Sequence, residues 1–287
     1  MVDKKKILQY IQIMKHKKQV ILITGASSGI GLATANYLAD KGYTVYGTAR
    51  RQFDAEKFSF LQADICSHQD MKNVFDTILE KEGHIDIVIN NAGMGISGAI
   101  EHTEKQNIST IFETNIVALV DVCALAIPYL RQNGGGKIIN ISSVAAPIAI
   151  PFQACYSATK SAIETFSFAL SNEIKPFKIK VCCVRPGDTK TGFTSARVKN
   201  SIEKDENYGD RISKSVKKME KDEQKGMSPE IAGDYIGKEL ISHKNGQQRH
   251  CCTSCSNPDP AVRQEMCCQM LCRMEAMTHG NAKTRHQ

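Results

Sequence analysis

Six short apolar runs divide residues 19–184, and longer stretches with a helical pattern lie between them. Continuous apolar runs of this length are typical of strands covered on both faces, as in parallel sheets. Strands that alternate with helices form βαβ units. The chain is therefore predicted to be a single α/β domain with a doubly wound parallel sheet. The predicted strands are Gln19–Thr24, Thr44–Thr48, Phe58–Leu61, Ile85–Asn90, Lys137–Ser142 and Ile179–Val184.

The net charge of +7 lies mostly at the two ends of the chain. Residues 1–18 form a basic extension, for which a membrane-surface helix is the less favoured alternative, and residues 243–287 form a cysteine-rich, atypical tail. The central domain, residues 19–242, is nearly neutral, which argues against nucleic-acid binding. No apolar run of about eighteen residues and no secretory signal is present, so no membrane span is expected. Scattered cysteines in the domain indicate reduced packing residues and a cytoplasmic protein.

A glycine-rich turn joins the first strand to the first helix, with the sequence Thr24-Gly25-Ala26-Ser27-Ser28-Gly29-Ile30-Gly31. Gly25 allows a tight turn, Gly29 lets the backbone approach a pyrophosphate, and Gly31 permits close packing of helix on strand. The helix N-terminus then presents free N–H groups to the phosphates. The turn predicts a Rossmann-type dinucleotide site, with a purely structural turn as the alternative. Its candidate cofactor-binding residues are Gly25, Ser27, Ser28, Gly29, Ile30 and Gly31.

The end of the second strand bears on the choice between NAD and NADP. An acidic residue there hydrogen-bonds the ribose 2′-hydroxyl of NAD, whereas an arginine accommodates the 2′-phosphate of NADP. Ala49 occupies the acidic position, and Arg50 and Arg51 follow it. A guanidinium matches a phosphate with two parallel hydrogen bonds. NADP(H) is therefore expected in preference to NAD(H); the alternative is that both arginines only face solvent.

Three polar side chains are predicted to converge at one edge of the sheet. Tyr156 and Lys160 are four residues apart on a predicted helix, so they share a face. Ser143 follows the strand Lys137–Ser142, at the carboxyl edge where open α/β sheets bind ligands. A hydroxyl, a phenol and an ammonium at one site can move a proton on and off a carbonyl or alcohol oxygen. The alternative for Tyr156 and Lys160 is an ordinary surface pair.

Together these motifs resemble the short-chain dehydrogenase/reductase family in order and spacing, over about residues 17–240. Residues 91–193 are most similar to the subgroup of hydroxysteroid and retinol dehydrogenases and acyl-dihydroxyacetone-phosphate reductases. The resemblance is carried by Thr24-Gly25-x-x-x-Gly29-x-Gly31, Asn90-Asn91-Ala92-Gly93, Asn115, Ser143, Tyr156-x-x-x-Lys160 and Pro186-Gly187.

The resemblance implies a catalytic tetrad. Tyr156 would be the general acid/base, and Ser143 would orient the substrate oxygen. Lys160 would hold the nicotinamide ribose and lower the pKa of Tyr156, since a cation about 4 Å away is worth about 3 pKa units at an effective dielectric near 20. Asn115 would kink its helix so that its backbone carbonyl holds a proton-relay water.

The resemblance also implies contacts to the cofactor and the substrate. The adenine contact corresponds to Asp64 and Ile65, and the turn beside the adenine ribose to Asn91, Ala92 and Gly93. The loop that holds the nicotinamide carboxamide corresponds to Pro186, Gly187, Thr189 and Thr191. Candidates for the wall of the substrate pocket are Gly95, Ser97 and Gln153, beside Ser143 and Tyr156.

Residues 193–226 carry many alternating charges, few large apolar residues and no predicted strand. They form either a solvated helical insertion or a lid over the substrate pocket, and their position after the sixth strand favours the lid. Ser228–Ile241 is predicted as the next helix. The apolar run typical of the family's seventh strand is missing after His243, which leaves that strand in doubt; its loss would expose a sheet edge.

Six cysteines crowd into residues 251–272, which leaves three hypotheses for the tail. Cys252-x-x-Cys255 followed by Cys268-x-x-x-Cys272 suggests zinc ligands, but the spacings are irregular and no metal site is predicted. A disordered or frame-shifted tail is the second hypothesis. An interaction or redox segment is the third.

The sequence therefore predicts an oxidoreductase that moves a hydride between NADP(H) and a ketone or secondary alcohol, with a lipophilic substrate such as a steroid, retinoid or acyl-ketone. The alternatives are a reductase of small carbonyls or sugars, a non-catalytic NADP(H)-sensing protein, and an interaction protein with a zinc-binding tail. The family pairs subunits through the helices predicted at Asn107–Gln132 and Tyr156–Ile174. Their excess of apolar residues predicts a homodimer or homotetramer.

Overall fold

The computed structural model describes residues 18–200, 205–242 and 251–252. These residues form a seven-stranded parallel sheet in the order β3-β2-β1-β4-β6-β7-β9. The predicted doubly wound α/β fold is confirmed, and each predicted strand lies close to its expected position. The strands are β1 (Val20–Thr24), β2 (Thr44–Ala49), β3 (Ser59–Gln62), β4 (Ile87–Asn90), β6 (Gly136–Ile141), β7 (Ile179–Arg185) and β9 (Cys251–Cys252).

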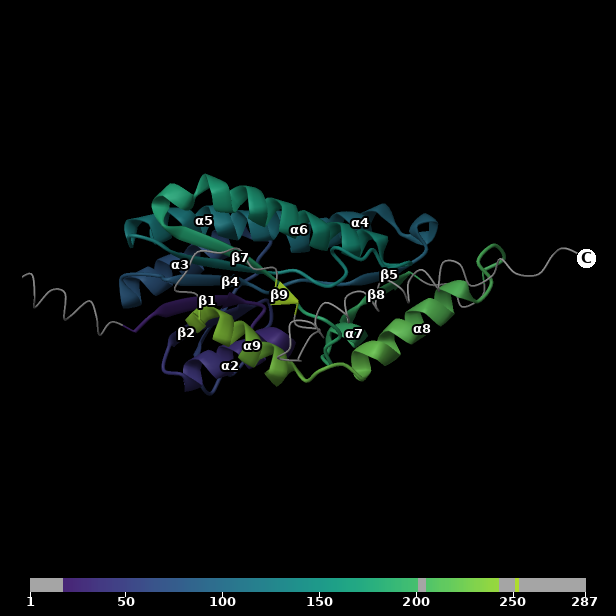
Figure 1. The fold of residues 1–287 in the computed structure, drawn as a ribbon, viewed down its shortest axis with the longest axis horizontal. Helices are drawn as coiled ribbons and strands as arrows, with labels where there is room; N and C mark the ends of the chain where they lie inside the picture. The colour runs from purple at the N-terminus through teal and green to yellow at the C-terminus, as the bar shows by residue number, and fades with distance from the viewer. Residues whose placement is uncertain (1–17, 201–204, 243–250, 253–287) are drawn as a thin grey trace, which may run out of the picture.

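Helices cover both faces of the sheet (Figure 1). One face carries α3 (His68–Glu82), α5 (Ala118–Gln132) and α6 (Ala154–Glu173), and the other carries α2 (Gly29–Asp40) and α9 (Pro229–Ser242). Strand β1 shows why the apolar runs are continuous. Val20 and Leu22 pack into the first core and Ile21 and Ile23 into the second, since successive side chains point to opposite faces.

The longest helical rod precedes β6 and has a π-helical turn at its centre. It consists of α4 (Lys105–Phe112), the π-helical η2 (Glu113–Val117) and α5, so the predicted helix Asn107–Gln132 is confirmed. By length and composition alone this rod is apolar enough to cross a membrane, and 39% of its most apolar window, with a mean hydropathy of 1.8, is buried in the fold. Two short 3₁₀ segments, η1 (Ile100–His102) and η3 (Lys175–Phe177), lie elsewhere in the chain.

The strand order reverses between β1 and β4, and side chains join the carboxyl ends of these two strands. The Thr24 hydroxyl accepts hydrogen bonds from the backbone N–H groups of Asn91 and Ala92, both at 3.1 Å. The Asn91 amide donates to the carbonyl oxygens of Thr24 and Gly25, at 3.0 and 3.1 Å. In open α/β sheets the crevice outside such a switch point is where ligands bind.

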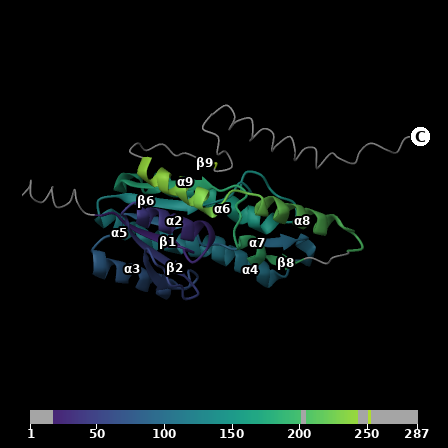
Figure 2. The same cartoon turned by 90° about the horizontal axis from the view of Figure 1, so that it is seen from below.

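The segment after β7 forms a separate layer at one end of the sheet, where α7 (Phe193–Ala196), β8 (Val198–Asn200) and α8 (Arg211–Gln224) lie together (Figures 1 and 2). The expectation that residues 193–226 contain no strand is wrong, because β8 pairs in parallel with β5 (Ile96–Gly98). β8 has three residues and only one apolar side chain, and its partner is distant in sequence. No local pattern could therefore reveal the pairing.

The seventh strand, which the sequence leaves in doubt, is present as β9. The two-residue strand β9 pairs with Val184 and Arg185 of β7, and so covers part of the sheet edge. Two cysteines among polar residues make no apolar run, which explains why the pattern was not recognisable. The other predictions for residues 1–17 and 243–287, including the basic extension and the zinc ligands apart from Cys252, lie outside the described residues.

Candidate active site

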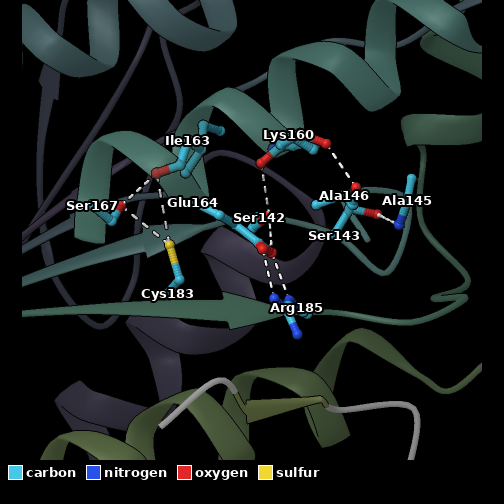
Figure 3. Close-up of polar contacts among 11 residues, drawn as sticks. Ser142, Ser143, Ala145, Ala146, Lys160, Ile163, Glu164, Ser167, Cys183 and Arg185 are labelled. Atoms are coloured by element: carbon cyan, nitrogen blue, oxygen red, sulfur yellow. Dashed lines mark hydrogen bonds and ion pairs between the residues drawn. The ribbon is translucent and has the colours of Figure 1, made fainter. Parts of the chain in front are cut away.

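Polar contacts hold helix α6 onto β6 and β7 (Figure 3). The hydroxyl of Ser142, directly after β6, lies 3.2 Å from the carbonyl oxygen of Lys160 and 3.0 Å from Oε1 of Glu164. Arg185 on β7 binds the same carboxylate through Nε and Nη2, each at 2.5 Å. A bidentate pair fixes orientation as well as charge. These contacts hold the turn of α6 that carries Lys160 over the end of β6.

Asn115 and Lys160 stabilise the backbone around the site through hydrogen bonds. Asn115 lies in the π-helical turn η2 and is only 1% exposed. It accepts a hydrogen bond from the N–H of Met94 at 2.8 Å, and donates to the Met94 carbonyl at 3.0 Å and to the Thr159 hydroxyl at 3.1 Å. The buried Lys160 donates to the carbonyl of Ile141 at 2.9 Å. The predicted irregularity at Asn115 is thus a π-helical turn, which ties the loop after β4 to α6.

Tyr156 stands one turn before Lys160, with the lysine Nζ 5.7 Å from its ring centroid. Burial raises the pKa of Tyr156 to about 12, although a hydrogen bond from Ser143 and the charge of Arg197 lower it; Glu223 raises it further. Burial also lowers the pKa of Lys160 to about 8. Lys160 was expected to lower the pKa of Tyr156 toward neutral pH. Among the chain's own groups this expectation is not met, because burial of the phenol raises its pKa more than the nearby charges lower it.

The glycine-rich turn forms a close-packed cradle for a ligand. Gly25 and Gly29 have left-handed φ angles of +69° and +55°. A Cβ on Gly25 would lie 2.8 Å from the Cα of Ala92, and one on Gly31 would lie 2.3 Å from the carbonyl oxygen of Gly25. Ser28 is the N-cap of α2 and makes no side-chain capping bond within the described residues, so the first N–H groups of the helix remain available. This arrangement fits a dinucleotide pyrophosphate, with Ser27 and Ile30 on the same turn.

Arg50 and Arg51 are both exposed at the end of β2. Arg50 lines a cavity of about 420 Å³ together with Asp64 and residues of β3 and α3. Of the two predicted adenine contacts, Asp64 therefore faces this cavity, whereas the side chain of Ile65 packs into the core beside α3.

The loop after β7 meets the glycine-rich turn, as its predicted role in holding the cofactor requires. A Cβ on Gly29 would lie 3.4 Å from the Cβ of Thr191. The Thr189 hydroxyl donates to the carbonyl of Gly187 at 3.0 Å. The carbonyl of Pro186 accepts from the backbone N–H of Val144 at 3.2 Å, which joins this loop to the one that carries Ser143.

The predicted pocket wall is buried and lies against residues 193–197 of the predicted lid. A Cβ on Gly95 would lie 2.9 Å from the ring of Phe193 and 3.3 Å from Nε of Arg197. The Phe193 ring is 5.7 Å from the Tyr156 ring. Ser97 on β5 is 2% exposed, and Gln153 at the start of α6 is 4% exposed. On the other side, a Cβ on Gly93 would lie 3.7 Å from Nζ of Lys160, so the loop after β4 borders both halves of the site.

The structure brings several residues to this site that were not predicted from the sequence. Glu164 was within reach, because it follows Lys160 by four residues and so shares its helical face. Arg185 and Arg197 come from a strand end and from a lid that was read as a run of charges. Their positions next to Glu164 and Phe193 result only from tertiary packing.

Comparisons with known proteins agree with this geometry. A family model described as short chain dehydrogenase matches residues 19–201. A 3-ketodihydrosphingosine reductase of Bacteroides thetaiotaomicron is 42% identical over 229 residues, which cover 79% of this chain and 85% of that protein. The crystal structure of a short-chain dehydrogenase from Streptomyces avermitilis superposes with a TM-score of 0.73 at 26% identity, covering 92% of this chain and 98% of that one. The structure of ElxO with NADP bound, at 24% identity and a TM-score of 0.67, shares the fold and covers 82% of this chain and 97% of its own.

The bonds of Asn115 to Met94 and Thr159 give a prediction about stability. Asn115→Asp replaces the amide that donates to both residues by a carboxylate oxygen, which faces two acceptor oxygens instead. Since an unsatisfied buried polar group costs about 1–3 kcal/mol, and a charged one more, we expect at least this loss of unfolding free energy in urea titrations. Asn172→Asp, an exposed change on α6, is the control and should leave the midpoint nearly unchanged. Equal midpoints for both variants would contradict the role of Asn115 as a brace.

Proposed function

Because this chain belongs to the short-chain dehydrogenase family of nicotinamide-dependent oxidoreductases, we propose that it interconverts a lipophilic ketone and its secondary alcohol with NADP(H). The observation that carries this proposal is the convergence of Ser143, Tyr156 and Lys160 at the carboxyl edge of the sheet, braced by Asn115. The bound nicotinamide supplies or accepts the hydride. The chain's own residues position the substrate oxygen and move the proton.

The proton chemistry follows from the surroundings of Tyr156. Burial keeps the phenol protonated at neutral pH, so it can donate its proton to the oxygen of a ketone. The Ser143 hydroxyl, which hydrogen-bonds the phenol, can hold that same oxygen. Lys160, fixed by the carbonyl of Ile141, places a positive charge 5.7 Å from the phenol ring and stabilises the phenolate left after transfer.

The cofactor preference is supported by the end of β2. Arg50 lines the cavity beside Asp64, and Ala49 provides no carboxylate to repel a 2′-phosphate. The main contact to that phosphate is therefore assigned to Arg50, with exposed Arg51 next to it. The cradle formed by Gly25, Gly29 and the N-terminus of α2 suits the pyrophosphate of either cofactor, so it does not distinguish NADP(H) from NAD(H).

An apolar substrate is supported by the side chains around the phenol and under α8. Phe193 lies against Tyr156, and a small apolar cluster joins Phe152 to the lid helix through Ile212 and Val216. The relative that is 42% identical is named for the reduction of a keto compound. Within the described domain, Cys66, Cys123, Cys155 and Cys183 are free thiols, which supports the proposed cytoplasmic location.

Removing the phenol oxygen tests the proposal directly. Tyr156→Phe should lower NADPH-dependent ketone reduction by about 10²–10⁴-fold and leave NADPH binding intact, because only the proton donor is lost. In the unaltered enzyme, reduction should fall as pH rises through the pKa of Tyr156, whereas alcohol oxidation should rise. Tyr37→Phe, on the outer helix α2, is the matched control. Near-native turnover in Tyr156→Phe, or NADPH binding without turnover of any ketone by the unaltered protein, would favour the NADP(H)-sensing alternative.

Cofactor preference is tested at the two arginines. Arg50→Ala should weaken NADPH binding by about 10–100-fold, which corresponds to one charge-assisted contact of about 1.5–3 kcal/mol, and should change NADH binding little. Arg51→Ala is the paired variant and should have a smaller effect. Equal losses for NADPH and NADH in fluorescence titrations would show that neither arginine reads the 2′-phosphate.

We also propose that the chain forms a homodimer or homotetramer through the outer layer of α4, α5 and α6. Phe112 on α4, Val117 in the connecting η2 and Phe168 on α6 are 36%, 51% and 57% exposed, although they are large and apolar. Figure 1 shows the three helices side by side on one face of the molecule. An apolar surface on neighbouring helices is what an isologous twofold interface requires.

The assembly is tested by introducing a charge on this apolar surface. Phe168→Glu should lower the mass measured by light scattering at micromolar concentration, because the carboxylate must be buried between subunits. Ile231→Glu, at a residue 53% exposed on the opposite face, is the control and should retain the interface. A monomeric unaltered protein would refute the proposed assembly.

A further inference from the structure

A buried arginine of the lid is separated from the phenol of Tyr156 by a single aromatic ring. Arg197 directly precedes β8, and its side chain is 1% exposed. Its guanidinium carbon is 5.6 Å from the centroid of the Phe193 ring, and that ring is 5.7 Å from the ring of Tyr156. Gly95 allows this approach, since a Cβ there would lie 3.3 Å from Nε of Arg197. Guanidinium, phenyl and phenol are therefore close neighbours along one wall of the site.

Glu223 of helix α8 holds this arginine from the far side. Its Oε1 forms an ion pair with Nη2 of Arg197, and its Oε2 accepts a hydrogen bond from the Thr194 hydroxyl at 2.7 Å. Nε and Nη1 of Arg197 are buried and make no hydrogen bond within the described part of the chain. In a buried site of low dielectric, the electrostatic effect of a guanidinium with a single ionic partner still extends over several ångströms.

A second ion pair links the same helix to β8 itself but lies farther out. Lys199, two residues beyond Arg197, binds Glu220 of α8 at 2.6 Å, and its side chain is 45% exposed. Residues i and i+2 of a strand share a face, as do residues i and i+3 of a helix, so the two pairs form a matched row. The Lys199–Glu220 pair serves lid docking without a buried charge beside Tyr156.

We propose that Arg197, held by Glu223, is a positioning residue whose charge favours the ionised form of Tyr156 when the lid helix α8 is docked. Charged groups lie around the phenol on three elements: Lys160 on α6, Arg197 in the segment before β8, and Glu223 on α8. Ser143, from the loop after β6, adds a neutral hydrogen bond. Arg197 lowers the pKa of Tyr156 and Glu223 raises it, so the two members of the pair act in opposite directions.

The opposite signs provide the test, which rests on the proposed function because it measures the pH dependence of alcohol oxidation with NADP⁺. Oxidation needs the phenolate, so its acidic limb reports the apparent pKa of Tyr156. Arg197→Met should move this limb upward by about one pH unit, the size expected for one charge at an effective dielectric near 20. Glu223→Gln should move it downward, because it leaves the arginine uncompensated. The double variant R197M/E223Q should return toward the unaltered enzyme.

Lys199→Met is the matched control, since it breaks a lid ion pair on the same strand and helix. It should leave the pH limb in place even if turnover falls. If Arg197→Met, Glu223→Gln and Lys199→Met all lower turnover with no shift of the limb, or if the first two shift it in the same direction, the pairs only dock the lid and the proposal is wrong.

A readout without turnover separates this proposal from the proposed function. Ultraviolet difference titration of the NADP⁺ complex against Tyr156→Phe measures ionisation of this one phenol. Opposite shifts in Arg197→Met and Glu223→Gln would support the proposal even if no alcohol is oxidised. Should Arg197→Met fail to fold, Arg197→Lys keeps the charge and Glu223→Gln alone still tests the sign, since an unshifted or upward-shifted phenol there would overturn the proposal.

Discussion

The packing of α6 on β6 and β7 is the contact on which the site depends, because this helix carries both Tyr156 and Lys160. Ile163 and Leu170 of α6 pack into the apolar core, and polar bonds also cross the interface. Asn140 on β6 donates to the Ser167 hydroxyl at 2.7 Å, and Ser167 donates to the carbonyl of Ile163 at 2.6 Å. Buried polar groups are stable only when they are paired, so such bonds select one register of helix on sheet.

The same interface affects the pKa values of Tyr156 and Lys160. Burial raises the pKa of Tyr156 and lowers that of Lys160. The phenol therefore keeps its proton more strongly, and the ammonium loses its proton more easily. A fully apolar wall would push both groups further toward their neutral forms. Ser143 and Arg197 counteract this at the phenol, and they come from different parts of the chain. The pKa of Tyr156 is thus a balance between burial, which raises it, and the Ser143 hydroxyl and Arg197 charge, which lower it.

The proposed lid is attached by contacts that link distant parts of the chain. Its short strand β8 pairs with β5, and the backbone of Met227 bonds to Asp188 and Lys190 on either side of Thr189. Ion pairs to Glu220 and Glu223 then hold α8 beside the wall of the site. Removing both charges of a buried ion pair from water costs much of the free energy that their attraction provides. Such contacts therefore specify the position of α8 more than they add stability. The lid can therefore be tied to the chemistry without adding much to the stability of the core.

The sequence by itself determined the α/β class, the six main strands and the convergence of Ser143, Tyr156 and Lys160, because these follow from periodicity and from spacing along one helix or one strand end. It also located the glycine-rich turn and Asn115, whose bonds are mostly to neighbouring loops. Only the tertiary structure decided the pairing of β8 with β5, the return of β9 to the edge of β7, and the place of Arg197 beside Phe193. These contacts join residues far apart in the chain, and two- or three-residue strands have no period to read. The pKa of Tyr156 was likewise set by burial, which depends on everything that packs around the phenol and not on its spacing from Lys160.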